Sequence, residues 1–245
     1  MKNSTALITG GAKRIGREIS LFLASQGYDL VVSYNKSKID AQKLAAEIAT
    51  KYRVKCDIFK ADISDLKQVQ KLADFTKKNS KNWNLLINNA SIFNKSKFIS
   101  GSDSDLAENL NIHFFSPLKL SHEFAKNSPQ NGQIINMVDK NIARFDTNYF
   151  HYLLSKKFLA ETTKMLALEL APEIRVNAVA PGFILNSIDE KNPSEETKKL
   201  TKKIPLQKKG EIENIVQSIE FLLGNDFING QIIFVDGGAS LNHAG

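Results

Sequence analysis

The sequence has little cysteine and no long hydrophobic run. Cys56 is the single cysteine among 245 residues, so the chain cannot form an intramolecular disulfide. Its place in the stretch VKCDIF favours a core strand over a reactive thiol. The first ten residues, MKNSTALITG, lack the apolar run that a signal peptide or a membrane-spanning helix requires. We therefore expect a soluble, cytoplasmic protein with no membrane partner and no bound metal.

Positive charge is scattered along the chain. The formal net charge is +7, and the one dense run of lysines is KKLTKKIPLQKK at residues 198–209. No aromatic residue interleaves that run, as a stacking platform for single-stranded nucleic acid would require. We interpret the run as a solvated helix face and expect no nucleic-acid partner.

Short apolar runs alternate with segments of helical period, a pattern typical of βα units around a parallel sheet. The pattern predicts a single-domain α/β fold over residues 1–245: a Rossmann-like, doubly wound parallel sheet of about seven strands with helices on both faces. An irregular connection late in the chain suggests a substrate lid at 183–209. The expected strands are 6–9, 29–34, 55–60, 84–88, 133–138, 174–180 and 231–236.

A glycine-rich turn follows the first expected strand. In TGGAKRIG, Gly10, Gly11 and Gly16 permit a tight turn, and residues 14–26 can form the next helix. The amino end of such a helix can hold a pyrophosphate through backbone N–H groups and the helix dipole. The turn therefore indicates a dinucleotide cofactor.

The end of the second strand predicts which dinucleotide binds. NAD sites place an acidic residue there for the ribose hydroxyls, but SYNKS at residues 33–37 contains no acid and offers Lys36 and Ser37 instead. Lys13 and Arg14 in the glycine turn add positive charge where a phosphate would lie. We therefore predict NADPH.

Tyr152 and Lys156 are four residues apart, so on a helix their side chains share one face. A nearby ammonium can lower the pKa of a phenol from its usual value of about 10, which would let Tyr152 exchange a proton at neutral pH. Together with the glycine turn, NNA at 88–90, PG at 181–182 and VDGG at 235–238, this pair resembles the short-chain dehydrogenase/reductase family over essentially the whole chain.

The resemblance implies roles for further residues. Asn111 matches the asparagine that supports a proton relay through water to the lysine, and Asp62 matches the residue beside the adenine. The helices near 103–127 and 149–171 resemble those that pair subunits in family tetramers, so a homotetramer is expected. The cofactor-binding residues expected from the motifs are Gly10, Lys13, Arg14, Ile15, Gly16, Tyr34, Asn35, Lys36, Ser37, Asp62, Asn89, Ala90, Tyr152, Lys156, Pro181 and Gly182.

Two departures from the family pattern narrow the expected substrate. Asp139 stands where the family normally has a serine, and Arg14 stands where it has a glycine. The pteridine reductases, including the bacterial dihydromonapterin and dihydrofolate reductases, resemble this chain at both positions. The resemblance extends to NNASIF, in which Ser91 and Phe93 match residues that line the pterin site.

A carboxylate in place of the serine has a chemical reason. A carbonyl oxygen needs only donors around it, whereas a reduced pterin presents ring N–H and amino donors beside an imine nitrogen that must gain a proton. The carboxyl group of Asp139 can accept from those donors when ionised, or relay a proton when protonated. The resemblance further implies that Phe93 stacks the heterocycle against the nicotinamide and that Arg14 lies at the polar edge of the pterin.

The predicted function is NADPH-dependent reduction of a dihydropterin, either dihydromonapterin or dihydrobiopterin, with dihydrofolate as a weaker substrate. Tyr152, Lys156, Asp139 and Asn111 are the expected catalytic residues. One alternative is a carbonyl reductase of the same fold, acting on a β-ketoacyl carrier protein or a sugar. A second is a non-catalytic protein that senses a dinucleotide, which need not retain Tyr152 together with Lys156.

Overall fold

A computed structural model describes residues 4–127, 131–184 and 195–242. Within these ranges seven strands form one parallel sheet in the order β3-β2-β1-β4-β5-β6-β7. Each strand begins and ends within one residue of its predicted range, so the predicted fold class is confirmed. The strands are β1 (Thr5–Ile8), β2 (Asp29–Tyr34), β3 (Cys56–Lys60), β4 (Trp83–Asn88), β5 (Gly132–Met137), β6 (Ile174–Pro181) and β7 (Ile232–Val235).

Helices connect the strands in the expected alternation. The predicted helix after the glycine turn is present and ends at Ser25, one residue early. A π-helical turn, η1, lies between α4 and α5, and a short 3-10 helix, η2, follows β5. The helical segments are α1 (Arg14–Ser25), α2 (Lys38–Tyr52), α3 (Leu66–Asn79), α4 (Asp103–Leu110), η1 (Asn111–Phe115), α5 (Ser116–Asn127), η2 (Lys140–Ala143), α6 (Phe150–Glu169), α7 (Glu195–Lys202) and α8 (Ile212–Gly224).

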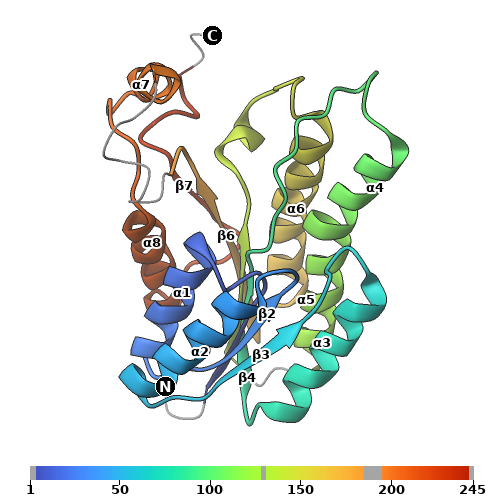
Figure 1. Ribbon diagram of the computed structural model, residues 1–245, viewed down its shortest axis with the longest axis vertical. Coiled ribbons are helices and arrows are strands. Elements are labelled where there is room, and N and C mark those ends of the chain that lie inside the picture. The colour runs from blue at the N-terminus through green and yellow to red at the C-terminus, as the bar shows by residue number, and fades with distance from the viewer. Residues whose placement is uncertain (1–3, 128–130, 185–194, 243–245) are drawn as a thin grey trace.

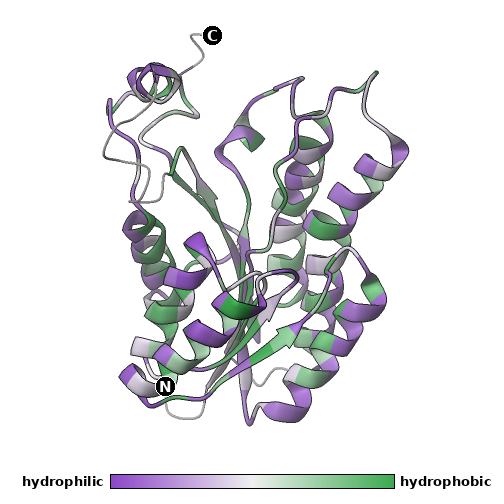
Figure 2. Cartoon of the chain, viewed as in Figure 1, coloured by the Kyte–Doolittle hydropathy of each residue, from purple (hydrophilic) through white to green (hydrophobic). Residues whose placement is uncertain are grey.

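The two faces of the sheet bury separate sets of side chains. Ala6 and Ile8 of β1 pack with α1, α2 and α8, whereas Leu7 between them packs with α3 and α5 on the opposite face. Figure 1 shows these two helix layers, and Figure 2 shows hydrophobic residues concentrated on the strands and the inward helix faces. Full burial of a side chain such as Leu7 stabilises the fold by roughly 1.5–3 kcal/mol.

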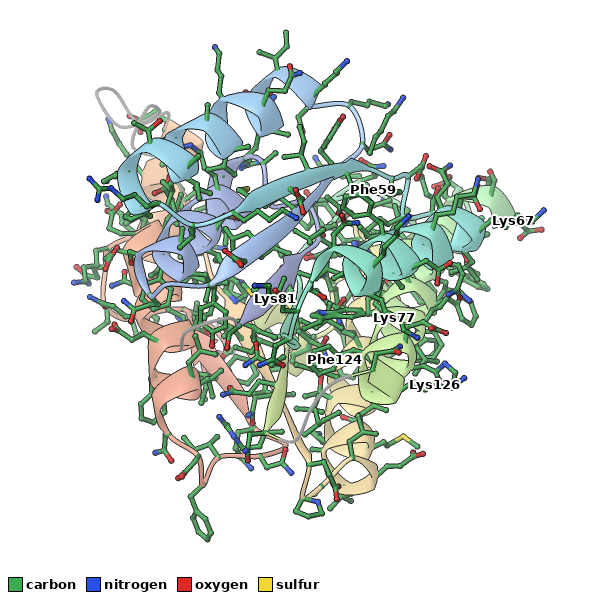
Figure 3. The ribbon with its side chains drawn as sticks, turned by 90° about the horizontal axis from the view of Figure 1, so that it is seen from below. Phe59, Lys67, Lys77, Lys81, Phe124 and Lys126 are labelled. Atoms are coloured by element: carbon green, nitrogen blue, oxygen red, sulfur yellow. The ribbon has the colours of Figure 1, made fainter. Side chains whose placement is uncertain are left out.

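Aromatic side chains pack between the sheet and the helices α3 and α5, whereas lysines lie on the outside of this part of the molecule. Phe59 packs against Phe75 with ring centroids 4.8 Å apart, and Trp83 meets the edge of Phe124 at 5.2 Å. Phe59 and Phe124 point inward in Figure 3, whereas the labelled lysines lie on the outside of α3, α5 and the turn before β4. That arrangement agrees with a solvated role for much of the positive charge. The exposed lysines labelled there are Lys67, Lys77, Lys81 and Lys126.

The strand order reverses between β1 and β4, and in sheets of this kind ligands bind beyond the carboxyl ends of the strands at such a point. The connection predicted as a lid, 183–209, belongs to the same edge: Ile184 bridges Gly210, and α7 lies beyond β7 in Figure 1. Residues 185–194 of that prediction lie outside the described residues. In the described part of the chain, none of the helices combines the length and apolarity needed to cross a membrane.

Candidate active site

The glycine turn after β1 is held from across the strand reversal. The side-chain amide of Asn89 donates to the carbonyl oxygens of Thr9 and Gly10 at 2.9 and 3.2 Å. The Thr9 hydroxyl in turn accepts from the backbone N–H groups of Asn89 and Ala90 at 2.9 and 3.0 Å. A Cβ atom on Gly16 would lie 2.4 Å from the Gly10 oxygen, so the turn requires glycine there. Hydrogen bonds and close packing therefore join Gly10 and Gly16 of the turn to Asn89 and Ala90 of the β4 loop.

The amino end of α1 is open to an anion. Lys13 precedes the helix without a side-chain hydrogen bond to its first turn, so the first-turn N–H groups are available to a phosphate. Arg14 adopts a left-handed conformation, with φ of 52°, which side chains other than glycine rarely adopt. Such strain is commonly found at functional sites. Ile15 is half-buried, whereas Lys13 and Arg14 are exposed.

The end of β2 has the composition expected for a phosphate-bearing ribose. Tyr34 is buried, while Asn35 and Lys36 are exposed and no acidic residue lies among residues 33–37. Ser37 precedes α2 and makes no side-chain cap hydrogen bond. The Lys13 ammonium pairs with Asp40 of α2 at 2.9 Å, so a bound phosphate would compete with that carboxylate.

Asp62, the predicted adenine residue, lies at the end of β3. Its carboxylate accepts from the backbone N–H and the hydroxyl of Ser64 at 2.9 and 2.7 Å. These hydrogen bonds lower the pKa of the Asp62 carboxyl group, with a further contribution from Asn35. Asp62 is therefore an ionised acceptor beside the end of β2.

The structure joins Tyr152 and Asp139 directly. The phenol O–H of Tyr152 donates to Asp139 Oδ2 at 2.8 Å, and Asp139 Oδ1 accepts from the backbone N–H of Asn141 at 2.7 Å. Asp139 precedes η2, and Tyr152 lies in the first turn of α6. Burial and the Asp139 carboxylate raise the pKa of the Tyr152 phenol well above its ordinary value. Tyr152 is therefore a protonated hydrogen-bond donor at neutral pH.

Lys156 lies on the same face of α6 as Tyr152 but acts differently from the sequence-based expectation. Its Nζ donates to the carbonyl oxygen of Met137 at 2.7 Å and lies 5.9 Å from the centroid of the Tyr152 ring. Burial lowers the pKa of Lys156 to about 8, against the opposing effect of Asp139. The prediction that Lys156 lowers the pKa of the phenol is wrong for this arrangement, because burial and Asp139 dominate and raise it.

His113 is a site residue that the sequence analysis missed. Its ring lies 5.3 Å from the Tyr152 ring, nearly perpendicular to it, and hydrogen-bonds Ser155 and Ser91 at 2.9 Å each. The predicted Asn111 begins η1 and is half-buried. Among the described residues, no hydrogen bond joins its amide to Tyr152 or Lys156. The relay role assigned to Asn111 therefore stays a prediction.

Aromatic side chains form the rim of the site. Phe93 is 56% exposed, stacks on Tyr149 with centroids 4.3 Å apart, and meets Tyr152 edge-on at 4.8 Å. Ser91, also exposed, lies on the same loop. This exposed aromatic wall beside the phenol suits a flat ligand.

Pro181 ends β6, and Gly182 follows it on the same edge of the sheet. The Gly182 N–H donates to the carbonyl oxygen of Val235 at 2.9 Å, and a Cβ on this glycine would lie 2.6 Å from Asp236 Cα. The predicted cofactor residues thus lie at the carboxyl ends of the strands, in the loops that follow them or in the first turn of α1, except for Tyr152 and Lys156, which lie on α6.

Comparison with known proteins agrees with this geometry. A family model described as Enoyl-(Acyl carrier protein) reductase matches residues 10–240. The chain is 30% identical over 240 residues to a dihydromonapterin reductase of Enterobacter sp. (strain 638), covering 96% of each chain. It is also 30% identical over 243 residues to the 3-oxoacyl-[acyl-carrier-protein] reductase FabG of Staphylococcus epidermidis, covering 96% of this chain and 98% of that one.

Among solved structures, the FolM alternative dihydrofolate reductase 1 from Brucella canis, complexed with NADP, superposes with a TM-score of 0.91. It shares 31% identity, with 99% of this chain and 96% of that chain covered. Because the family match spans most of the chain, and the relatives align over nearly their full lengths, the chain belongs to the short-chain dehydrogenase/reductase family.

Proposed function

We propose that the protein reduces a dihydropterin to its tetrahydro form with NADPH. The observation that carries the proposal is the hydrogen bond from Tyr152 to Asp139, which places a carboxylate beside the proton donor of the site. Support also comes from the similarity to a dihydromonapterin reductase and to an alternative dihydrofolate reductase. Dihydromonapterin and dihydrobiopterin are the proposed substrates, with dihydrofolate weaker.

The residues of the glycine turn fit the cofactor. The uncapped first turn of α1 can bind its pyrophosphate, and the close approach at Gly16 leaves no room for a side chain between the turn and Asn89. Lys36 would contact the 2′-phosphate of the cofactor. Arg14 would contact the cofactor and the polar edge of the pterin. Asp62 would accept from the adenine amine. When bound, NADPH supplies the hydride that reduces a ring carbon of the substrate.

The protein's own groups hold and move the proton. Reduction of a C=N bond adds hydride to carbon and a proton to nitrogen. Tyr152, protonated at neutral pH, can turn its one hydrogen from Asp139 toward that nitrogen and donate it, and the phenolate then recovers a proton from solvent before the next turnover. The oxygens of Asp139 can accept from a ring N–H or amino group of the substrate. Lys156 holds the backbone at Met137 and would contact the nicotinamide ribose. Phe93 would cover the flat ring.

A carbonyl reductase is the second candidate, because the chain is as similar to FabG as to the dihydromonapterin reductase. A carbonyl oxygen, however, would have to approach an Asp139 carboxylate that already accepts from Tyr152, and oxygen acceptors repel one another. A non-catalytic dinucleotide sensor is the third candidate. It gives no reason to bury Tyr152, Lys156 and His113 close together.

The test is a panel of dihydromonapterin, dihydrobiopterin, dihydrofolate and an acetoacetyl thioester, each assayed with NADPH and with NADH. The proposal expects the highest kcat/KM for a dihydropterin with NADPH. Faster reduction of the thioester would favour the carbonyl reductase, and NADPH binding without turnover of any of the four would favour the sensor.

We also propose a cytoplasmic homotetramer. The segments predicted to pair subunits form α4, η1, α5 and α6, and they carry large apolar side chains on the surface that a second copy would cover. Sedimentation at micromolar concentration tests the assembly. The exposed side chains on these elements are Phe115, Phe158, Met165 and Leu168.

A further inference from the structure

Both ring nitrogens of His113 have partners inside the protein. The side chain is 1% exposed. Its Nδ1 lies 2.9 Å from Ser155 Oγ, and its Nε2 lies 2.9 Å from Ser91 Oγ and accepts the backbone N–H of Ile92 at 3.2 Å. One imidazole therefore joins the loop after β4 to the helix that carries Tyr152.

These partners determine the tautomer of the ring. A backbone N–H can only donate, so Nε2 of His113 must present its lone pair to Ile92. The single proton of a neutral imidazole is then on Nδ1 and is donated to Ser155. Ser155 Oγ can accept it, because its own hydrogen goes to the carbonyl oxygen of Tyr152 at 2.7 Å. Every donor in this chain has an acceptor.

The direction of the Ser91 hydroxyl follows from the tautomer. Its hydrogen has three acceptors within the protein: His113 Nε2 at 2.9 Å, the carbonyl oxygen of Ile92 at 3.2 Å and the phenol oxygen of Tyr152, whose own hydrogen goes to Asp139. Each of these bonds directs the hydrogen of the exposed Ser91 side chain to another group of the protein. The oxygen lone pairs are then left for the site, so Ser91 accepts hydrogen bonds there, as Asp139 does.

We propose that His113 is a positioning residue with two separable effects: through Nε2 it makes Ser91 an acceptor for an N–H or amino group of the substrate, and through Nδ1 and Ser155 it holds the first turn of α6 and thus Tyr152. The inference rests on the proposed function. Two neighbouring acceptors, Ser91 and Asp139, suit the edge of a pterin that carries its amino and ring N–H groups, and they do not suit a carbonyl oxygen. Burial and the charge of Lys156 lower the pKa of His113 to about 2, which keeps the ring neutral throughout the working pH range.

Two conservative variants separate the effects. An asparagine amide reaches the position of Nδ1 and can still donate to Ser155, but it loses the hydrogen bonds with Ile92 and Ser91. A glutamine amide reaches the position of Nε2 and can still accept from Ile92 and Ser91, but it loses the hydrogen bond with Ser155. The proposal expects His113→Asn to raise KM for the dihydropterin about tenfold with kcat nearly retained, and His113→Gln to lower kcat about tenfold with KM nearly retained. His122→Asn on the exposed face of α5 is the matched control and should change neither constant.

A merely structural role would lower the apparent kcat of both variants in proportion to the loss of folded protein measured by thermal unfolding, and would leave KM of both variants unchanged, because unfolded molecules do not alter the affinity of the folded ones. That outcome would overturn the proposal. The tautomer is checked without any substrate by ¹⁵N NMR of the ring in the cofactor-free protein. The proposal expects a neutral Nδ1–H imidazole from pH 5 to pH 8, and a neutral Nε2–H form or a protonated ring contradicts it. Because this signal needs no turnover, failure of the pterin assignment and failure of the role of His113 are distinguishable.

Discussion

The phenol of Tyr152 donates its hydrogen to the carboxylate of Asp139 at 2.8 Å. The carboxylate opposes ionisation of the phenol, because a phenolate would place two negative charges in contact within a buried site. The arrangement thus keeps a proton on Tyr152 and puts hydrogen-bond acceptors next to it. That combination distinguishes this site from one built around a serine hydroxyl.

Tyr152→Phe should remove the proton donor and leave the ring in place. We expect kcat for the dihydropterin to fall by at least about a hundredfold, the scale of a lost general acid. The dissociation constant of NADPH should change little, because the ring still packs against Phe93 and His113. Steady-state kinetics and fluorescence titration with NADPH measure the two quantities. Near-normal turnover would mean that another group, with Asp139 the first to test, supplies the proton.

Lys156 should make the free energy of unfolding depend on pH in the alkaline range. Its pKa in the folded protein is about 8, against 10.5 for an unperturbed lysine. Between these values the unfolded chain binds a proton that the folded protein does not, so the free energy of unfolding should rise with pH from about 8 to about 10.5. The gain relative to Lys156→Met should be on the order of 3 kcal/mol. Urea unfolding of both cofactor-free proteins at pH 7.5 and pH 10 measures it, and parallel pH curves would contradict the buried ammonium.

The backbone of Arg14 should be strained, and its guanidinium should contribute to ligand binding. Arg14→Gly relieves the left-handed φ of 52°, whereas Arg14→Ala keeps that strain. Both lose the guanidinium. We expect the glycine variant to be more stable than the alanine variant by about 0.5–1 kcal/mol, the reverse of the usual order at a helix position. Both variants should raise KM for NADPH or the dihydropterin alike. Equal stability of the two variants would show that the conformation at residue 14 costs nothing.

Lys36 should determine the preference for the phosphorylated cofactor. Lys36→Glu replaces a cation at the end of β2 with the acid that NAD sites use, so the ratio of kcat/KM for NADPH to that for NADH should fall by about ten- to a hundredfold, equivalent to roughly 1–3 kcal/mol. Lys43→Glu, exposed on α2, controls for the change in net charge. Equal use of both cofactors by the unaltered protein would contradict the assignment.

The fold and most of the cofactor edge could be predicted from the sequence, because both depend on local signals. Apolar runs mark the strands of a parallel sheet, and Gly10 and Gly16 mark a turn that leaves no room for side chains. The strand order, which brings Asn89 against that turn, places these residues together without further information.

The remaining site features depend on contacts that no local pattern encodes. His113 stands in the apolar stretch NIHFF, and only the packing of the β4 loop against α6 gives its ring two sets of partners. The pKa of Tyr152 was predicted in the wrong direction because helical spacing places Lys156 on the same face but shows neither the burial of the phenol nor its contact with Asp139, which raise that pKa. The left-handed conformation of Arg14 likewise could not be predicted from the sequence and is seen only in the backbone of the structure.

The most direct test of the account is the ratio of kcat/KM for dihydromonapterin to that for an acetoacetyl thioester, measured in the parent protein and in Asp139→Ser at matched amounts of folded protein. If the Asp139 carboxylate recognises the pterin and supports the Tyr152 proton, Asp139→Ser should lower the ratio by about a hundredfold while the NADPH dissociation constant and the melting temperature stay nearly unchanged. A ratio that does not fall, with both substrates slowed alike, would contradict the claim that this carboxylate selects the substrate.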